Sequence, residues 1–242
     1  MSRIALIPAR SGSKRISGKN LRLLNGHPLI AYSIVSAIKS NMFSRVYVSS
    51  DSDEIVNISR KYGAEIPGLR PKELAQDDSP DIEWVKFAIN NWIGDGSDAT
   101  LAIIRPTSPL RKPETLQDAV LKFESNAWAD SLRAMEKVSQ HPGKMWRVSE
   151  DLAATPFLPQ ESNQTPTHSR PTQSLEELYV QNASLEVTSV QSVLTNGTIS
   201  GNKVLSYTMP GKEGFDLNTE EDWVLLNALV KSDASLLPEI GY

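Results

Sequence analysis

RIALIPARSGSKRISGKN, residues 3–20, joins a short apolar run to a basic loop. The run from Ile4 to Ile7 ends at Pro8, and an apolar run of this length predicts a strand that is buried in a parallel sheet. From Ala9 to Asn20 the chain is polar and carries several glycines, serines and positive charges. A loop of this kind directly after the first strand of an α/β protein favours phosphate binding.

Further along the chain, apolar runs alternate with amphipathic patterns. Runs at 45–49 and 100–104 predict two more strands. Helical patterns begin near residues 28, 53, 82 and 113. This alternation predicts an α/β fold with three layers, in which helices cover both faces of a doubly wound, mostly parallel sheet. Ligands of such sheets bind at the carboxyl ends of the strands, so we expect the functional site there.

The alternation stops over residues 138–178, which are rich in proline, glutamine, serine and threonine. A segment of this length inside a compact domain is more often functional or an interface arm than a linker. Runs at 185–190 and 203–208 then predict two strands, and the acidic stretch after Thr219 predicts a capping box at the start of a helix. The sequence therefore predicts a single domain, residues 1–242, with 138–178 as an inserted arm.

The composition indicates a globular protein, with 39% hydrophobic and 22% charged residues. A net charge of −4 provides no overall positive field, so we expect neither nucleic acid nor a membrane as a partner. Because cysteine is absent, disulfides and thiolate chemistry are excluded. No apolar run approaches the roughly 20 residues of a membrane helix, and Pro8 comes too early for a signal peptide. A cytoplasmic location is expected.

The basic loop contains four cations, two glycines and three serines. A glycine such as Gly12 lets backbone N–H groups approach an anion closely, and lysine and arginine neutralise phosphate charge. The loop departs from a Walker P-loop, because five residues rather than four separate Gly12 from Gly18. In addition, Asn20 stands where a serine or threonine would hold magnesium. The sequence predicts a polyphosphate site that uses a different arrangement.

Four blocks follow one another along the chain: IPARSGSKRISGKN with LNGHPLIAYSI (7–20 and 24–34), VSSDSDEIVNISRKYGAE (48–65), IRPTSPLR (104–111) and GFDLNTEEDW (214–223). In this order they resemble the acylneuraminate cytidylyltransferases, the CMP-sialic acid synthetases. The resemblance covers nearly the whole chain apart from the middle insertion. It implies a fold like that of the nucleotide-diphospho-sugar transferases and a magnesium-dependent transfer of CMP from CTP.

The resemblance, together with the loop chemistry, suggests roles for individual residues. We expect nucleotide binding by Arg10, Gly12, Ser13, Lys14, Lys19, Asn20, Arg70 and Ser79. We expect sugar-acid binding by Arg105, Thr107, Ser108, Gln181 and Asn182. Mg²⁺ is expected on Asp216 and Asn218. Catalysis is expected from Lys19, Arg10 and Asp216, which neutralise charge on the triphosphate and hold the metal.

Two positions depart from the usual pattern of this family. Arg105 stands where many relatives have glutamine, and its guanidinium either takes the substrate carboxylate by two hydrogen bonds or pairs with a neighbouring acid. Asn218 stands where the second of two aspartates is usual. Its amide oxygen either ligates the metal without charge or only caps the following helix.

We therefore expect a cytidylyltransferase that activates N-acetylneuraminic acid, or a related eight- or nine-carbon 2-keto sugar acid, and releases pyrophosphate. Two alternatives remain open, a P-loop-like phosphotransferase and a nucleotide-binding regulator without catalytic activity on the same fold. The segment 138–178 resembles the region through which relatives dimerise, so a homodimer is expected.

Overall fold

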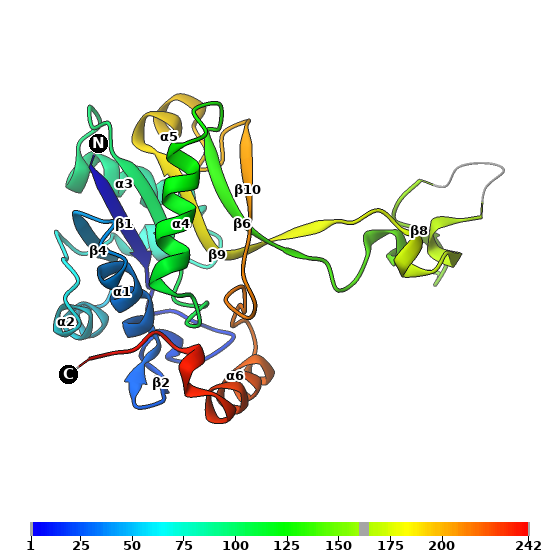
Figure 1. Ribbon diagram of the computed structural model, residues 1–242, viewed down its shortest axis with the longest axis horizontal. Coiled ribbons are helices and arrows are strands. Elements are labelled where there is room, and N and C mark those ends of the chain that lie inside the picture. The colour runs from blue at the N-terminus through cyan, green and yellow to red at the C-terminus, as the bar shows by residue number, and fades with distance from the viewer. Residues whose placement is uncertain (1, 160–164, 242) are drawn as a thin grey trace. The chain divides into compact units, whose positions relative to one another are not determined.

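The computed structural model describes residues 2–159 and 165–241. Its central sheet contains β1 (Arg3–Pro8), β4 (Arg45–Ser49), β5 (Thr100–Ile104), β6 (Ser131–Lys137), β9 (Tyr179–Ser189) and β10 (Val204–Thr208). The strands lie in the order β10-β6-β9-β5-β1-β4 (Figure 1). β1 pairs in parallel with β4 and with β5, whereas β9 pairs antiparallel with β5. The predicted α/β class with a mostly parallel sheet is confirmed.

Six α-helices connect and flank the strands in the described ranges: α1 (Leu29–Lys39), α2 (Asp53–Lys61), α3 (Asp81–Ala88), α4 (Pro113–Glu124), α5 (Val190–Asn196) and α6 (Glu220–Ser232). A π-helical turn, Ile89–Ile93, continues α3. Short 3-10 turns occur at Lys19–Leu21, Lys72–Ala75, Pro142–Lys144, Thr167–Ser169, Thr172–Ser174 and Ala234–Leu236. Two small hairpins pair β2 (Leu23–Leu24) with β3 (His27–Pro28) and β7 (Trp146–Val148) with β8 (Ala154–Pro156). Over 2–159 and 165–241, every helix is too short or too polar to cross a bilayer.

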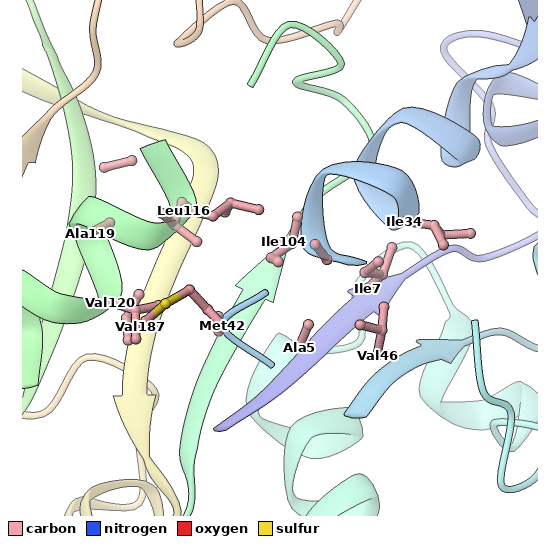
Figure 2. Close-up of a cluster of buried hydrophobic side chains, with 14 of the residues drawn as sticks. Ala5, Ile7, Ile34, Met42, Val46, Ile104, Leu116, Ala119, Val120 and Val187 are labelled. Atoms are coloured by element: carbon pink, nitrogen blue, oxygen red, sulfur yellow. The ribbon is translucent and has the colours of Figure 1, made fainter. Parts of the chain in front are cut away.

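Alternate residues of β1 enter two different cores, because successive side chains of a strand face opposite sides of the sheet. Ala5 and Ile7 pack with residues of α1 and α4, and Figure 2 shows this core with Ile34 of α1 close to the strands. Ile4 and Leu6 pack with residues of α3 and α5 on the other face. Burial on both faces explains why the run is continuously apolar and produces the predicted three layers.

A third core joins the basic loop to the C-terminal part of the chain. Ile16, in the middle of the loop, is fully buried together with Leu217, Trp223 and Leu226. α6 begins with the predicted capping box, in which Thr219 and Asp222 bond reciprocally to each other's backbone N–H groups. These contacts bring the first and the last of the four sequence blocks together.

The chain divides into two compact units. Unit 1 comprises the residues up to Ala134 and those from Asn182 onward, and unit 2 is Met135–Gln181. The predicted insertion, 138–178, lies within unit 2. In unit 2 the β7–β8 hairpin presents Trp146, whose ring centroid lies 4.6 Å from that of His168. Unit 2 therefore has secondary structure of its own.

One strand of the central sheet and one helix that packs on the sheet were not predicted from the sequence. β6 reads SLRAMEK, and its inward-facing Arg133 interrupts the apolar pattern because it pairs with Glu186 of β9 at 2.9 Å. α5 has seven residues, which is too short to display a helical period. Partnered charges and short length hide both elements from an analysis of hydrophobic periodicity.

The core predicts a contrast between two leucines. Leu6 is fully buried in β1, so Leu6→Ala should lower the free energy of unfolding by about 2–5 kcal/mol. Leu23 is 63% exposed, and Leu23→Ala should change the free energy of unfolding by no more than about 0.5 kcal/mol. Urea unfolding of both variants tests this, and similar losses for the two would contradict the assignment of the core.

Candidate active site

A cavity of about 660 Å³ lies at the carboxyl ends of β1 and β5. Six cationic and three acidic side chains line it, which leaves an excess of three positive charges in a chain whose net charge is −4. They are Arg10, Lys14, Arg15, Lys19, Arg70 and Arg105, with Asp77, Asp81 and Asp216. A concave site with this excess concentrates positive potential and favours an anionic ligand.

The basic loop is held at its start, middle and end. Asp51, just after β4, accepts hydrogen bonds from the backbone N–H (2.8 Å) and the hydroxyl (2.7 Å) of Ser11. The buried side chain of Asn20 donates from Nδ2 to the carbonyl of Arg10 at 3.1 Å. Between them Ile16 is buried, and Gly18 adopts φ 60°, which favours glycine. The loop therefore has a defined shape around the cavity.

The Asp51 carboxylate remains ionised in this position. Burial alone would raise its pKa, but the hydrogen bonds from Ser11 outweigh burial and lower the pKa below the usual 3.8. Asp51 thus anchors the loop as an anion, which is a structural role.

Lys19 connects the basic loop with the C-terminal block. Its Nζ donates to the carbonyl of Leu217 at 3.1 Å, and it lines the cavity with Asp216. Burial lowers the pKa of Lys19, and the negative charge of Asp216 partly offsets this effect. A half-buried cation beside a carboxylate is positioned to meet a phosphate group.

Asp216 and Asn218 act as a pair. Asn218 Nδ2 donates to Asp216 Oδ2 at 2.7 Å, whereas Asp216 Oδ1 is buried and bonds to nothing within residues 2–159 and 165–241. Thr219 caps α6, so Asn218 is not the cap, and that alternative is wrong. Asp216 lines the cavity, and a carboxylate oxygen without a hydrogen-bond partner there fits a hard cation.

The protein alone supplies few oxygen ligands for such a cation. No cluster of three or more His, Asp or Glu side chains in the described residues could hold a metal ion. A magnesium ion on Asp216 would therefore take most of its oxygens from phosphate and water, as magnesium commonly does in proteins.

Arg105 is engaged by two carboxylates. Its Nη2 lies 2.7 Å from Asp81 Oδ2 and 3.0 Å from Glu186 Oε1. Burial would lower the pKa of Arg105, but Asp81 and then Glu186 raise it above its ordinary value. Of the two alternatives for Arg105, the pair with neighbouring acids is the one that this structure contains.

Arg70 has unused donors in the same cavity. It is only 4% exposed, and its guanidinium lies 5.7 Å from the ring centroid of Trp84. Its Nε and Nη2 are buried and make no hydrogen bond in the described structure. Burial lowers the pKa of Arg70, with Asp51 and Asp81 acting in the opposite direction. Two buried donors facing a cavity fit a ligand rich in acceptors.

Most of the residues expected to bind substrate meet at this cavity. Those that line it are Arg10, Ser13, Lys14, Lys19, Asn20, Arg70, Arg105, Thr107, Asp216 and Asn218. Within the described residues, the lining does not include Gly12, Ser79, Ser108, Gln181 or Asn182. Ser79 bonds within its own loop, its Oγ accepting from Gln76 N and donating to Glu73 O. Gln181 belongs to unit 2. The individual roles stay predictions.

The sequence analysis missed several polar residues of the site. Arg111 is fully buried and donates to Ser184 and Ser33 Oγ, so it ties the loop after β5 to β9 and α1. Burial lowers the pKa of Arg111 to about 9, so it still carries its charge at neutral pH. Asp77 and Asp81 were missed because only the fold brings them opposite cations of distant loops. The one available signal was the acidic pair at 77–78 within a proline-bounded loop.

Comparison with known proteins agrees with this geometry. The family model described as cytidylyltransferase matches residues 4–191, which is more than half of the chain. The chain belongs to the cytidylyltransferase family. It is accordingly a nucleotidyltransferase, and the predicted likeness to CMP-sialic acid synthetases is confirmed by the relatives below.

Three relatives show the range of similarity. CMP-N,N'-diacetyllegionaminic acid synthase of Legionella pneumophila is 31% identical over 97% of this chain and 98% of its own length. The N-acylneuraminate cytidylyltransferase of Escherichia coli is 30% identical over 92% of this chain, which spans about half (50%) of that relative. Pseudaminic acid cytidylyltransferase of Campylobacter jejuni is 39% identical over 52% of this chain and 55% of its own.

Solved structures of low identity share the fold. CMP:2-keto-3-deoxy-manno-octonic acid synthetase complexed with CTP superposes with a TM-score of 0.68, covering 96% of this chain and 100% of that chain at 13% identity. 4-diphosphocytidyl-2C-methyl-D-erythritol synthase from Anaerococcus prevotii gives 0.60 over 95% and 98% at 13% identity. The predicted transferase-like fold of this cytidylyltransferase is confirmed.

The lowered pKa of Asp51 predicts a pH-dependent effect of Asp51→Asn. The wild-type protein should be more stable than the variant at about pH 6, because the anionic anchor is complete above the ordinary value of 3.8. This advantage should shrink as the pH falls below 3.8 and through the lower folded value. Urea unfolding across this range measures it, with Asp95→Asn, an exposed loop residue, as control. A difference that stays constant with pH would contradict the ionised anchor.

Proposed function

We propose that this cytidylyltransferase couples CTP to a 2-keto sugar acid of the sialic acid type and forms a CMP-sugar and pyrophosphate. The observation that carries the proposal is the cavity in which the basic loop meets Asp216. The relatives' printed names supply the substrate class, since they act on legionaminic, neuraminic and pseudaminic acids. We also place the enzyme in the cytoplasm, the compartment that contains CTP.

The reaction requires charge neutralisation more than a strong base. The anomeric hydroxyl oxygen of the sugar acid forms a bond to the α-phosphorus of CTP, while the bond from that phosphorus to the bridging oxygen of pyrophosphate breaks and the hydroxyl proton passes to water. Arg10, Lys14 and Lys19 bind the triphosphate and stabilise the negative charge that develops on the leaving group. The anchors at Ser11 and Ile16 hold these cations in position, so little reorganisation is needed.

Asp216 is the residue that would hold Mg²⁺. Asp216 lines the cavity, its Oδ1 has no hydrogen-bond partner in the described residues, and Asn218 orients the carboxylate by donating to Oδ2. When bound, the ion supplies Lewis acidity and orients phosphate oxygens. Lys19, whose charge interacts with that of Asp216, lines the same cavity, so both side chains can meet the triphosphate together.

Buried polar atoms without partners support a hydroxyl-rich second substrate. In residues 2–159 and 165–241, Thr107 Oγ1 and Asn182 Nδ2 are buried and form no hydrogen bond. Thr107 lines the cavity beside Ala183, the residue that follows Asn182. Such groups carry a desolvation cost unless a ligand satisfies them, and sugar hydroxyls can donate and accept.

Removing a charge from the site should abolish most turnover. Lys19→Ala and Asp216→Ala should each lower kcat at least about a hundredfold, the usual loss for one transition-state stabiliser. Pyrophosphate release with CTP and a sugar acid measures the effect. Lys61→Ala and Glu221→Ala, two exposed residues, serve as controls. Near wild-type turnover in either site variant would refute the role of that residue.

The products separate this function from its rivals. Pyrophosphate release with CTP, tested against a panel of neuraminic, legionaminic, pseudaminic and octulosonic acids, supports the transferase. Release of orthophosphate would instead favour a phosphotransferase. Tight binding of CTP without any turnover on the panel would favour a regulator. The other nucleoside triphosphates are the controls for base selectivity.

We further propose that unit 2 mediates homodimerisation. Among the described residues of this unit, seven large apolar side chains are exposed: Met145, Trp146, Val148, Leu152, Phe157, Tyr179 and Val180. An apolar surface of this density in so small a unit is typical of an interface.

If unit 2 forms the dimer interface, a charge introduced on its apolar surface should weaken the dimer, whereas the same charge on α6 should not. The wild-type chain should have twice its monomer mass in solution at micromolar concentration, and Val148→Lys should shift it toward monomer, because a buried lysine at an interface lacks a partner. Light scattering after size exclusion measures the mass. Val224→Lys, at an exposed valine of α6, is the matched control and should leave the dimer intact. A monomeric wild-type protein would contradict the proposal.

A further inference from the structure

One carboxylate engages two of the cations that line the cavity. Arg10 Nη1 lies 2.6 Å from Asp77 Oδ1, and Lys14 Nζ lies 2.5 Å from Asp77 Oδ2. Both oxygens of Asp77 are thus directed at the residues that the proposed function assigns to the triphosphate. Asp77 itself lines the cavity.

Asp77 reaches the site from a separate loop. It follows the 3-10 turn Lys72–Ala75 and precedes α3. The loop is closed by its own hydrogen bonds, from Gln76 N to Ser79 Oγ (3.2 Å) and from Ser79 Oγ to Glu73 O (2.8 Å). These bonds do not involve the Asp77 side chain, so its carboxylate can leave the cations while the loop keeps its local structure.

The two ion pairs are exposed enough to exchange. The side chains of Lys14 and Asp77 are 83% and 40% exposed, and solvent-exposed pairs between long side chains contribute little net stability. A triphosphate carries several negative charges and many acceptor oxygens, so it binds the same cations more strongly than one carboxylate does. Arg10 and Lys14 cannot bind the Asp77 carboxylate and the triphosphate fully at the same time.

We propose that Asp77 is an exchangeable counter-ion that competes with the triphosphate for Arg10 and Lys14 and so sets the affinity of the site for polyphosphates. The proposal rests on the proposed function. In the free enzyme Asp77 neutralises the two cations. CTP displaces it, and Asp77 pairs with them again as pyrophosphate leaves. Asp77 therefore weakens nucleotide binding and favours product release.

The test compares neighbouring acids in the full-length chain. Dissociation constants for CTP and for inorganic tripolyphosphate are measured by calorimetry with Mg²⁺ present. Asp77→Asn should tighten both by about three- to tenfold, the range expected for removing competing exposed pairs. Asp78→Asn removes the same charge one residue away, from another exposed side chain, and should change either constant by less than about twofold. Asp77→Glu, which keeps the carboxylate, should bind close to wild type.

The outcomes separate this inference from the function on which it rests. Equal constants for Asp77→Asn and Asp78→Asn, or weaker binding by Asp77→Asn, would overturn the exchange. Failure of tripolyphosphate to bind any of the variants would overturn it as well. If Asp77→Asn tightens tripolyphosphate but no sugar acid yields pyrophosphate, the exchange stands and the proposed function fails. If turnover occurs but Asp77→Asn does not tighten binding, the proposed function stands and the exchange fails. Circular dichroism confirms that each variant is folded.

Discussion

The hydrogen bonds from Ser11 to Asp51 hold the basic loop, and the site depends on them. Like charges repel, so six cations remain around one cavity only if rigid elements hold them there. The loop has no regular secondary structure over its first nine residues, 9–17, and its shape comes from anchors at Ser11, Ile16 and Asn20. Each anchor is contributed by a different part of unit 1.

A second network stiffens the opposite wall of the cavity. Asp81, Arg105, Glu186 and Arg133 form a chain of ion pairs that links the start of α3, the loop after β5, β9 and β6. Breaking a buried ion pair by removing one partner is strongly destabilising, so Arg105 and the buried Glu186 hold each other in place. The guanidinium of Arg105 is therefore already engaged by carboxylates in the cavity wall. This limits the substrate groups that it can contact without losing one of these carboxylates.

Much of the fold could be predicted from the sequence because its signals are local. Apolar runs such as Ile4–Ile7 and the capping box at Thr219 depend only on neighbours in the chain. β6 could not be predicted, because Arg133 finds its partner on another strand. The site divides in the same way. The cations of the basic loop can be predicted as a site because they cluster in the sequence. Asp77 and Asp81 could not be predicted, because only the folded chain brings their side chains next to Arg10 and Arg105.

The buried contact of Ile16 with Trp223 and Leu226 has a consequence for biosynthesis. Residues near the start of the chain pack against a helix some 200 positions later, a contact of very high sequence separation. On the ribosome β1, β4 and β5 emerge long before α6 does, whereas β10 emerges only shortly before it. A nascent chain can thus pair its first strands while the basic loop still lacks its hydrophobic contacts with α6, so competence to bind nucleotide arises only after α6 has been synthesised.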